Sequence, residues 1–513
     1  MNAKLYFGSL ALVLLLSAGC TKRFDTINQN PNQPDHIDNE QLFLPAIIKN
    51  SVRNYSYISQ FGASVIGDYY ANQYNSGWDD AFAASQTENG FLWNFYSVLK
   101  DVENYRLLSR QKGDKNNEGV GLVLRCWMFQ VITDNYGDIP YSQAVQGKTA
   151  GIFQPAYDKQ EDIYYALMDS LKEANTLLAT GTDPINSDIL MGGSALRWQE
   201  FANGLRLRLL MRMSNVTGAK VDVGSEMSAI AADPNTYPLF TTYNDQAALQ
   251  FLTDNGFEFP AYHNSPIGDY HLSTTLQTEL SAINDPRIAY FAMPTPASLG
   301  SGTPVYAGVP NGIGTSETSY NGGANNQSQE APILMPVAGY SFSSPTAAQG
   351  MLLSCAEVQF ILAEGKERGL ITGGSDAETY YMNGIQDQFN YDQSRLSLLT
   401  LPFPVDITPA ASYFTQPAVA YTGTTDEKLY KIRIQRWFSM FYTGFEGWSE
   451  WRRTGVPKET KNGPSASIAD WPRRIRYPLS EQTENTTNYN AAVQALKAQG
   501  GDDDLLTRVW WNK

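Results

Sequence analysis

Apolar residues recur at helical spacing along two long stretches of the chain, from about residue 87 to 216 and from about 351 to 498. A repeat every three or four residues places these side chains on one face of an α-helix. Polar residues and glycines divide both stretches into successive helix pairs. Four such pairs predict a mostly α-helical fold, a TPR-like scaffold of helix pairs that is similar to an α-solenoid.

Residues 217–350 separate the two helical regions and show little sustained helical periodicity. They are rich in Gly, Pro, Ser, Thr and Asn, and they keep dispersed rings such as Tyr270. A shorter stretch of the same kind, at 68–82, carries Trp78. Long irregular segments in a compact chain are usually functional loops or linkers, and rings favour ordered loops that bind a ligand. We expect residues 20–513 to form one domain built from the helical scaffold and these loops.

The N-terminus has the pattern of an exported lipoprotein. An apolar run at residues 6–16 follows one lysine and precedes three small residues, as is typical of a signal peptide. The run is too short for the ~20 apolar residues that span a bilayer. Cys20 comes directly after the small residues, so we expect residues 1–19 to be removed and Cys20 to be lipidated. Ordinary secretion is the alternative, because Ser17 stands where an aliphatic residue is usual.

The charge balance excludes one class of partner. Against 37 Lys and Arg residues stand 52 Asp and Glu residues, which gives a net charge of −15. A surface this acidic repels phosphate backbones, so we expect no nucleic acid partner. The 30 Tyr and 10 Trp residues supply rings with a polar edge, which suits a binding surface as well as a core. Cys126 and Cys355 lie in apolar helical patterns and are expected to be buried thiols, with a disulfide between them as the less favoured alternative.

The sequence contains no recognisable catalytic or metal-binding motif. Its 3 His residues are not at zinc-ligand spacing, and it has no H-E-x-x-H or G-x-S-x-G motif. We therefore expect a protein that is not an enzyme and has no cofactor. A surface glycosidase stays open as an alternative, because that chemistry needs only two facing carboxylates. The run Asp502-Asp503-Asp504 could bind structural calcium, although solvated charge is the favoured interpretation.

A series of short motifs follows LSAGC, the lipobox-like sequence at 16–20. The motifs are FDTINQNPN at 24–32, DNYGDIPY at 134–141, EVQFILAE at 357–364, the run from QRW at 435–437 through GFEGW at 444–448 to RRTG at 452–455, RRIRYP at 473–478 and WW at 510–511. With these motifs in this order, the chain resembles the SusD/RagB family of outer-membrane lipoproteins over nearly its whole length.

The resemblance implies a TPR-like helical scaffold with long loops, anchored by lipid to the outer membrane and facing the cell exterior. Members of the family cap a SusC-like TonB-dependent transporter, bind an oligosaccharide and deliver it to the pore, and they are not enzymes. RagB-like members bind a peptide instead. We therefore expect a protein that captures oligosaccharides for nutrient import. A peptide ligand is the alternative within the family, and an adaptor that binds only protein is an alternative outside it.

Ligand contacts are expected in the irregular loops, because a sugar site needs rings to stack on and polar groups to hydrogen-bond. One group within eight residues offers both: Asn72, Gln73, Tyr74, Trp78 and Asp79. The resemblance points to a second group in the middle insertion: Tyr262, His263 and Tyr270. The motifs that carry the resemblance are expected to build the fold instead, with the acids Glu446 and Glu450 pairing with Arg452 and Arg453.

Overall fold

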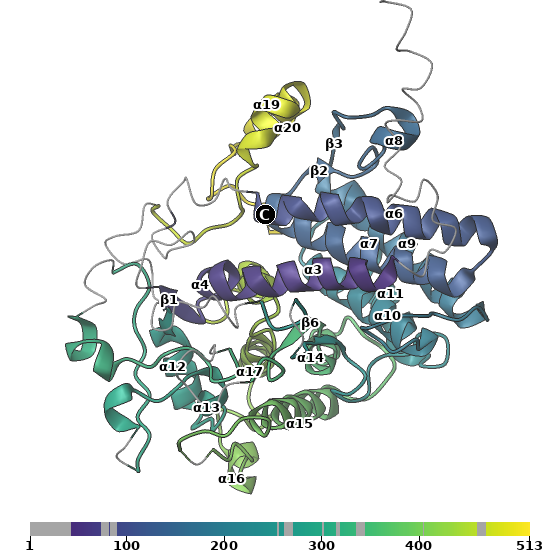
Figure 1. The fold of residues 1–513 in the computed structure, drawn as a ribbon. Coiled ribbons are helices and arrows are strands. Elements are labelled where there is room, and N and C mark those ends of the chain that lie inside the picture. The colour runs from purple at the N-terminus through teal and green to yellow at the C-terminus, as the bar shows by residue number, and fades with distance from the viewer. Residues whose placement is uncertain are drawn as a thin grey trace, which may run out of the picture. The chain divides into compact units, whose positions relative to one another are not determined.

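The computed structural model describes residues 43–72, 82, 90–253, 256–260, 270–299, 302–313, 319–334, 344–403, 405–458 and 468–512. These residues are mostly helical, as predicted, and carry only short strands (Figure 1). The strands form antiparallel pairs: β1 (Tyr70–Asn72) with β5 (Tyr270–Leu272), β2 (Ile139–Pro140) with β3 (Tyr157–Asp158), and β4 (Ala247–Gln250) with β6 (Gln349–Leu353).

The first helical region forms four long helices, each packed against the next along the chain (Figure 1). They are α6 (Phe95–Lys112), α7 (Lys115–Tyr136), α9 (Gln160–Thr180) and α10 (Ala195–Arg212). Gly113 ends α6 with a φ of +77°, a conformation that favours glycine at a helix C-terminus and lets the chain turn back into α7. The Ser194 side chain accepts the backbone N–H of Arg197 and so caps the start of α10.

The second helical region begins with α14, which packs against α10 and joins the two regions. Its helices are α14 (Cys355–Glu367), α15 (Ala377–Leu396), α17 (Thr425–Ser439) and α18 (Glu446–Thr454). Ser354, Asp376 and Thr424 cap the starts of α14, α15 and α17 through their side-chain oxygens. Both α15 and α17 contact α14, so α14 is the central helix of this region.

A further long helix, α3 (Leu44–Ile58), lies outside the predicted helical regions. Its apolar side chains face α6 and β6; they are Leu44, Ile47, Ile48, Val52 and Tyr55. The contact with β6 is close, since a Cβ at Gly350 would lie 2.4 Å from a methyl carbon of Val52. The spacing of these apolar residues is helical, so the sequence carried the signal for this helix.

Residues 217–350 contain more regular structure than their composition predicts. They include α11 (Val223–Ala232) and α12 (Thr274–Ala282), each capped by a side chain, from Asp222 and Ser273 respectively. Both helices are short and bury few side chains, so they leave only a weak periodicity in the sequence.

A further helix, α20 (Thr486–Ala498), lies near the C-terminus. The remaining helical segments are short: α4 (Ser64–Ile66), α8 (Gly147–Ala150), α13 (Ile288–Phe291), α16 (Ala411–Thr415), α19 (Leu479–Glu484), a π turn at Ser59–Ala63, and 3₁₀ turns at Phe91–Asn94, Pro296–Ser298, Ala324–Asn326 and Trp510–Asn512.

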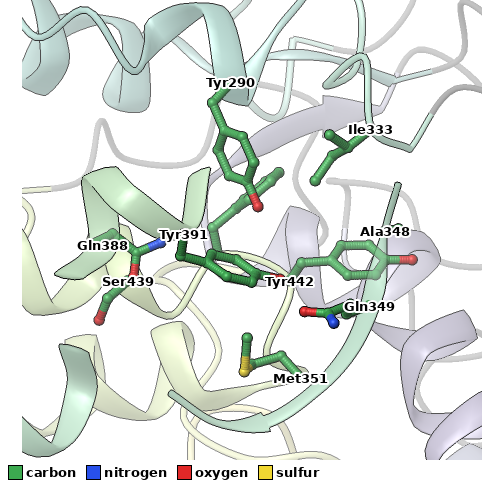
Figure 2. Close-up of a pocket in the computed structure, with 10 residues that line it drawn as sticks. Tyr290, Ile333, Ala348, Gln349, Met351, Gln388, Tyr391, Ser439 and Tyr442 are labelled. Atoms are coloured by element: carbon green, nitrogen blue, oxygen red, sulfur yellow. The ribbon is translucent and has the colours of Figure 1, made fainter. Parts of the chain in front are cut away.

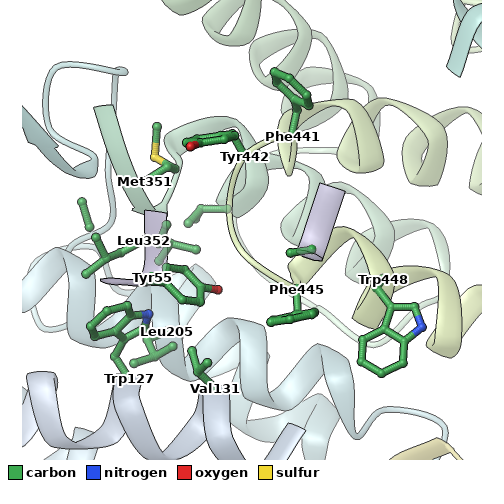
Figure 3. Close-up of a cluster of buried hydrophobic side chains, with 14 of the residues drawn as sticks. Tyr55, Trp127, Val131, Leu205, Met351, Leu352, Phe441, Tyr442, Phe445 and Trp448 are labelled. Carbon is green, nitrogen blue, oxygen red and sulfur yellow. The ribbon is translucent and has the colours of Figure 1, made fainter. Parts of the chain in front are cut away.

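Aromatic residues fill the core where α3, α7 and α10 meet β6 and the turn that follows α17 (Figure 3). The ring of Tyr55 meets Trp127 edge-on, with centroids 5.3 Å apart. Gly444 passes over the same tyrosine with a φ of +54°, and a Cβ there would lie 2.0 Å from the Tyr55 ring. The first glycine of the GFEGW motif is therefore a packing requirement of the core.

A row of alternating charges, which we call the charge row, runs through the interior and joins α7, α10, α14, α17 and α18. In order of contact its members are Asp134, Arg212, Glu446, Arg208, Glu357, Arg436, Glu450, Arg453 and Glu364. Neighbouring members approach within 2.5–3.5 Å, and Arg212 and Glu446 are closer still. All nine side chains are at most 3% exposed.

The charge row explains why the motifs shared with the family are needed. Burial alone would raise the pKa of Glu446, but the guanidinium groups of Arg208 and Arg212 outweigh it and lower that pKa to about 2. Glu364 has a lowered pKa for the same reason, with Arg453 as its main partner. Every acid of the row lies in one of the motifs or, in the case of Glu450, between two of them. The expectation that the motifs build the fold is confirmed for those that contribute to the row, while the motif at 24–32 lies outside the described residues.

One of the expected pairings is wrong. Arg453 pairs with Glu450 at 2.6 Å, as predicted, but Arg452 makes no such pair. Arg452 donates to the Asp134 carbonyl at 2.7 Å, and its guanidinium lies over the Trp448 ring at 3.7 Å from the centroid. The reason is helical geometry: residues three apart share a face of α18, whereas residues two or six apart do not.

Of the acids near the C-terminus, Asp502 is about half exposed, as expected for solvated charge, whereas Asp503 and Asp504 are engaged by the chain. Asp503 accepts hydrogen bonds from Arg474 at 2.8 Å and from the backbone N–H of Tyr477 at 3.1 Å. Asp504 accepts the backbone N–H of Thr507 at 2.7 Å. Asp503 therefore holds the end of the chain against the segment that follows α18, whereas Asp504 stabilises the local turn at 504–507.

The two cysteines in the described part of the chain, Cys126 and Cys355, are buried free thiols, as expected. Burial raises the pKa of Cys126 to about 12, which keeps this thiol protonated and unreactive.

Replacing a central member of the charge row should destabilise the protein strongly. Arg453→Ala leaves Glu364 and Glu450 buried without their shared cation, so we expect the free energy of unfolding to fall by about 3–5 kcal/mol. Lys497→Ala is the control, because it removes a half-exposed ion pair with Asp502 and should cost at most about 1 kcal/mol. Urea denaturation of both variants measures the difference, and equal losses would contradict a structural role for the row.

Candidate functional site

One residue from each expected group of ligand-binding residues lies in the β1–β5 pair. Asn72, the last residue of β1, stands directly opposite Tyr270, the first residue of β5. Segments 73–81 and 261–269 are covalently joined to these two residues, so they start from adjacent points although nearly 200 residues separate them. The other expected contacts lie outside the described residues, as does the lipidation site: Gln73, Tyr74, Trp78, Asp79, Tyr262, His263 and Cys20.

The described members of this pair are buried. Asn72 is 3% exposed and Tyr270 is fully covered, so in this structure both support the strands instead of presenting a surface. Tyr70 is likewise buried: it donates to the Phe291 carbonyl at 2.9 Å and accepts the Ala331 N–H at 2.8 Å. The β1–β5 pair is therefore a fixed base for the segments that leave it.

Neighbouring rings fix this base to the helical scaffold. Tyr69 stacks on Trp437 of α17 with centroids 4.5 Å apart and donates to the Trp437 carbonyl at 2.7 Å. Beyond segment 73–81, Phe82 is 2% exposed and packs edge-on against Trp471 at 5.0 Å. Segment 73–81 thus lies between two residues that are anchored in the core.

A polar groove of about 260 Å³ lies on α3, on the side away from the core. It is lined by Asn50, Arg53, Asn54, Tyr57 and Pro260. The four helical residues follow the spacing i, i+3, i+4 and i+7, which places them on one face of α3. The sequence interpretation missed this groove because it did not include α3, although the polar stripe was its signal.

The groove combines the groups that recognise sugars. Tyr57 is 40% exposed and offers a ring for stacking, while Asn50 and Asn54 offer amide donors and acceptors. Arg53 adds a guanidinium whose buried Nε has no hydrogen-bond acceptor among the described residues. Pro260 closes the groove and leads into segment 261–269, which ends at Tyr270 of the β1–β5 pair.

A cluster of tyrosines deeper in the fold is part of the core. Tyr290 of α13, Tyr391 of α15 and Tyr442 gather beside β6, as Figure 2 shows. The cavity that they line measures about 10 Å³, which is enough for about one water molecule and far too small for a sugar. The structure uses these rings for packing.

The described ranges contain neither a membrane-spanning helix nor a metal-binding group. None of the helices there is long and apolar enough to cross a membrane. Nor do His, Cys, Asp and Glu side chains form a group of three or more that could hold a metal ion in those ranges. Among the described residues, the groove on α3 brings a ring, amides and a guanidinium together, which suits an organic ligand.

Comparison with known protein families identifies the chain. A family model described as SusD-like, "Starch-binding associating with outer membrane", matches residues 31–478. The chain is a member of the SusD-like family. This family is associated with nutrient binding at the outer membrane. No curated protein matches the chain.

Solved structures of SusD-like proteins share the whole fold. An outer-membrane protein of Bacteroides vulgatus considered to take part in nutrient binding is 28% identical, with a TM-score of 0.78 over 93% of this chain and 100% of its own. A SusD homologue of Bacteroides fragilis is 25% identical, with a TM-score of 0.77 over 92% and 99%. A chitin-binding protein is 25% identical, with a TM-score of 0.74 over 93% and 100%.

The two faces of α3 should respond differently to substitution. Tyr57→Ala changes a half-exposed ring in the groove and should lower the free energy of unfolding by less than about 1 kcal/mol. Tyr55→Ala removes a ring that is 1% exposed on the opposite face, and should cost about 3–5 kcal/mol. Thermal and urea unfolding of the two variants tests this, and a large loss for Tyr57→Ala would make the groove a part of the core.

Proposed function

We propose that this SusD-like protein captures oligosaccharides at the outer membrane and passes them to a SusC-like TonB-dependent transporter. The observation that carries the proposal is the groove on α3, which offers a ring, two amides and a guanidinium. It is also lined by Pro260, from which the chain leads to Tyr270 of the β1–β5 pair. The family description as starch-binding and the chitin-binding relative support a glycan as the ligand.

In this proposal the ligand lies along the groove and under the two segments that start at the β1–β5 pair. The rings of Trp78 and Tyr262 would stack on the apolar faces of sugar units, and the amides of Asn54 and Gln73 would bind hydroxyl groups. Delivery to a transporter requires release, so the affinity is expected between about millimolar and micromolar, or roughly −4 to −8 kcal/mol.

We further propose that lipid on Cys20 holds the mature chain at the outer membrane, facing the cell exterior. The lipobox-like sequence supports this anchor, and the family's association with the outer membrane agrees with it. The transporter partner follows from the resemblance to SusD/RagB proteins, whose members close a SusC-like barrel. A binding protein needs no catalytic residues, in keeping with a role that ends when the glycan enters the transporter.

Calorimetric titration of the soluble chain that starts after Cys20 tests the ligand. We expect heat from one class of neutral oligosaccharide in a panel of host, plant and microbial glycans. Trp78→Ala and Asn54→Ala should each weaken that binding by about tenfold, the loss of one stacking ring or hydrogen bond. Phe153→Ala is the control, because Phe153 is an 81% exposed ring that does not line the groove.

The alternatives give different results in the same titration. Heat from a mixed peptide digest alone would place the chain with the RagB-like proteins. Oligosaccharides that are shortened in the calorimeter cell after titration would show that the protein is a glycosidase. If neither glycans nor peptides give heat of binding, the proposed function is wrong.

Fractionation of cells tests the anchor. The intact protein should enter the detergent phase in Triton X-114 partitioning, because an acyl chain contributes about 0.8 kcal/mol per buried CH₂. Cys20→Ala should remain in the aqueous phase, since it lacks the acylated thiol. Recovery of the unaltered protein from the aqueous phase would instead support ordinary secretion.

A further inference from the structure

A second polar cavity lies between the β4–β6 pair, the first turn of α10 and the last turn of α15. Its volume is about 120 Å³. Arg197 of α10 and Arg395 of α15 both line it, together with Gln246, Gln349 and Ser394. None of its lining residues is acidic, in a chain where acids outnumber bases by 52 to 37. Gln349 of β6 and Tyr391 of α15 also line the small tyrosine cavity of Figure 2, so the two cavities are neighbours.

Neither arginine of this cavity pairs with a carboxylate in the part of the chain that the structure describes. Arg197 donates to the carbonyls of Met191, Asp245 and Gln246, each at 3.3 Å. Arg395 donates to Gln250 at 3.0 Å and to Ser394 at 3.4 Å. These bonds use Nε and one terminal nitrogen of Arg395, which leaves its Nη2 available. By contrast, each arginine of the charge row lies between two acids.

A third side chain that lines the cavity has a donor without an acceptor among the described residues. Gln246 is 3% exposed, and its Nε2 is buried with no hydrogen-bond partner among the described residues. Its Oε1 accepts the backbone N–H of Cys355 at 3.3 Å, which fixes the orientation of the amide. A buried donor without an acceptor destabilises a protein, so an acceptor that enters the cavity could satisfy this group.

The acids closest in sequence to the cavity are engaged by the chain around it. Asp245 accepts the hydroxyl of Thr241 at 2.8 Å. Asp387 accepts the backbone N–H of Tyr243 at 2.7 Å. Asp392, next to the lining residue Tyr391, accepts the side-chain amide of Gln388 at 2.7 Å. None of the residues that line the cavity is itself acidic.

We propose that this cavity binds the oxyanion substituent of an acidic sugar, either a carboxylate or a sulfate ester. A guanidinium fork matches two oxygens of such a group, and the buried amide nitrogen of Gln246 supplies a further donor. The volume admits one charged substituent with part of its sugar ring. This inference rests on the proposed binding of glycans and adds to it that acidic glycans are among the ligands.

Titration with small sugars of matched size tests the cavity separately from the groove. The probes are sodium glucuronate, glucose 6-sulfate and glucose, added to the soluble chain at constant ionic strength and followed by calorimetry. We expect at least one charged sugar to bind about tenfold or more tightly than glucose, and the one that binds identifies the oxyanion. Arg395→Gln should weaken its binding by about tenfold or more.

Two further variants keep the test decisive. Arg395→Lys retains the charge without the fork and should bind with intermediate strength, which also covers the case in which Arg395→Gln does not fold. Arg110→Gln is the control, since Arg110 is 49% exposed and already pairs with acids. Charged sugars that bind no better than glucose, or that bind equally to Arg395→Gln, overturn the inference. If the charged sugars fail this test but neutral oligosaccharides still bind, the proposed function stands without this inference. If only the small anions bind and no oligosaccharide does, the proposed function is wrong.

Discussion

The charge row from Asp134 to Glu364 constrains how the helices of this protein meet. A hydrophobic contact tolerates a small shift of one helix along another, because one apolar side chain can replace another at the contact. A buried carboxylate does not, since a shift of one helical turn would leave it without its arginine at a cost of several kcal/mol. Nine members shared among α7, α10, α14, α17 and α18 therefore allow one arrangement of these five helices.

That arrangement reaches the candidate site through one pair of adjacent residues. Arg436 belongs to the charge row, and Trp437 beside it stacks on Tyr69. Tyr69 precedes β1, whose last residue faces the first residue of β5. The base of both candidate loops is thus connected by direct contact to the most constrained part of the molecule. Loops that change between relatives can then alter the ligand without altering the scaffold.

The scaffold could be predicted from the sequence because its signals are local. Periodicity located the helix pairs from 87 to 216, and the motifs indicated residues that build the fold. The site could be predicted only by region, because its geometry depends on contacts between distant segments. No local pattern places Asn72 opposite Tyr270 or brings Pro260 to α3. The burial of Tyr270 also could not be predicted, since a tyrosine in a Gly-rich and Pro-rich stretch has the same sequence context whether it packs in the core or binds a ligand.

The negative net charge of the protein affects ligand binding differently at the groove on α3 and at the cavity of Arg197 and Arg395. The groove on α3 offers mostly neutral groups, so the net charge of −15 has little effect on a neutral glycan. An anionic sugar is repelled at long range, but salt screens that field beyond about 8 Å at physiological ionic strength. Inside the cavity of Arg197 and Arg395 the ligand meets two uncompensated guanidinium groups and no lining acid. Local donors therefore decide binding there, because the long-range repulsion by the acidic surface is screened.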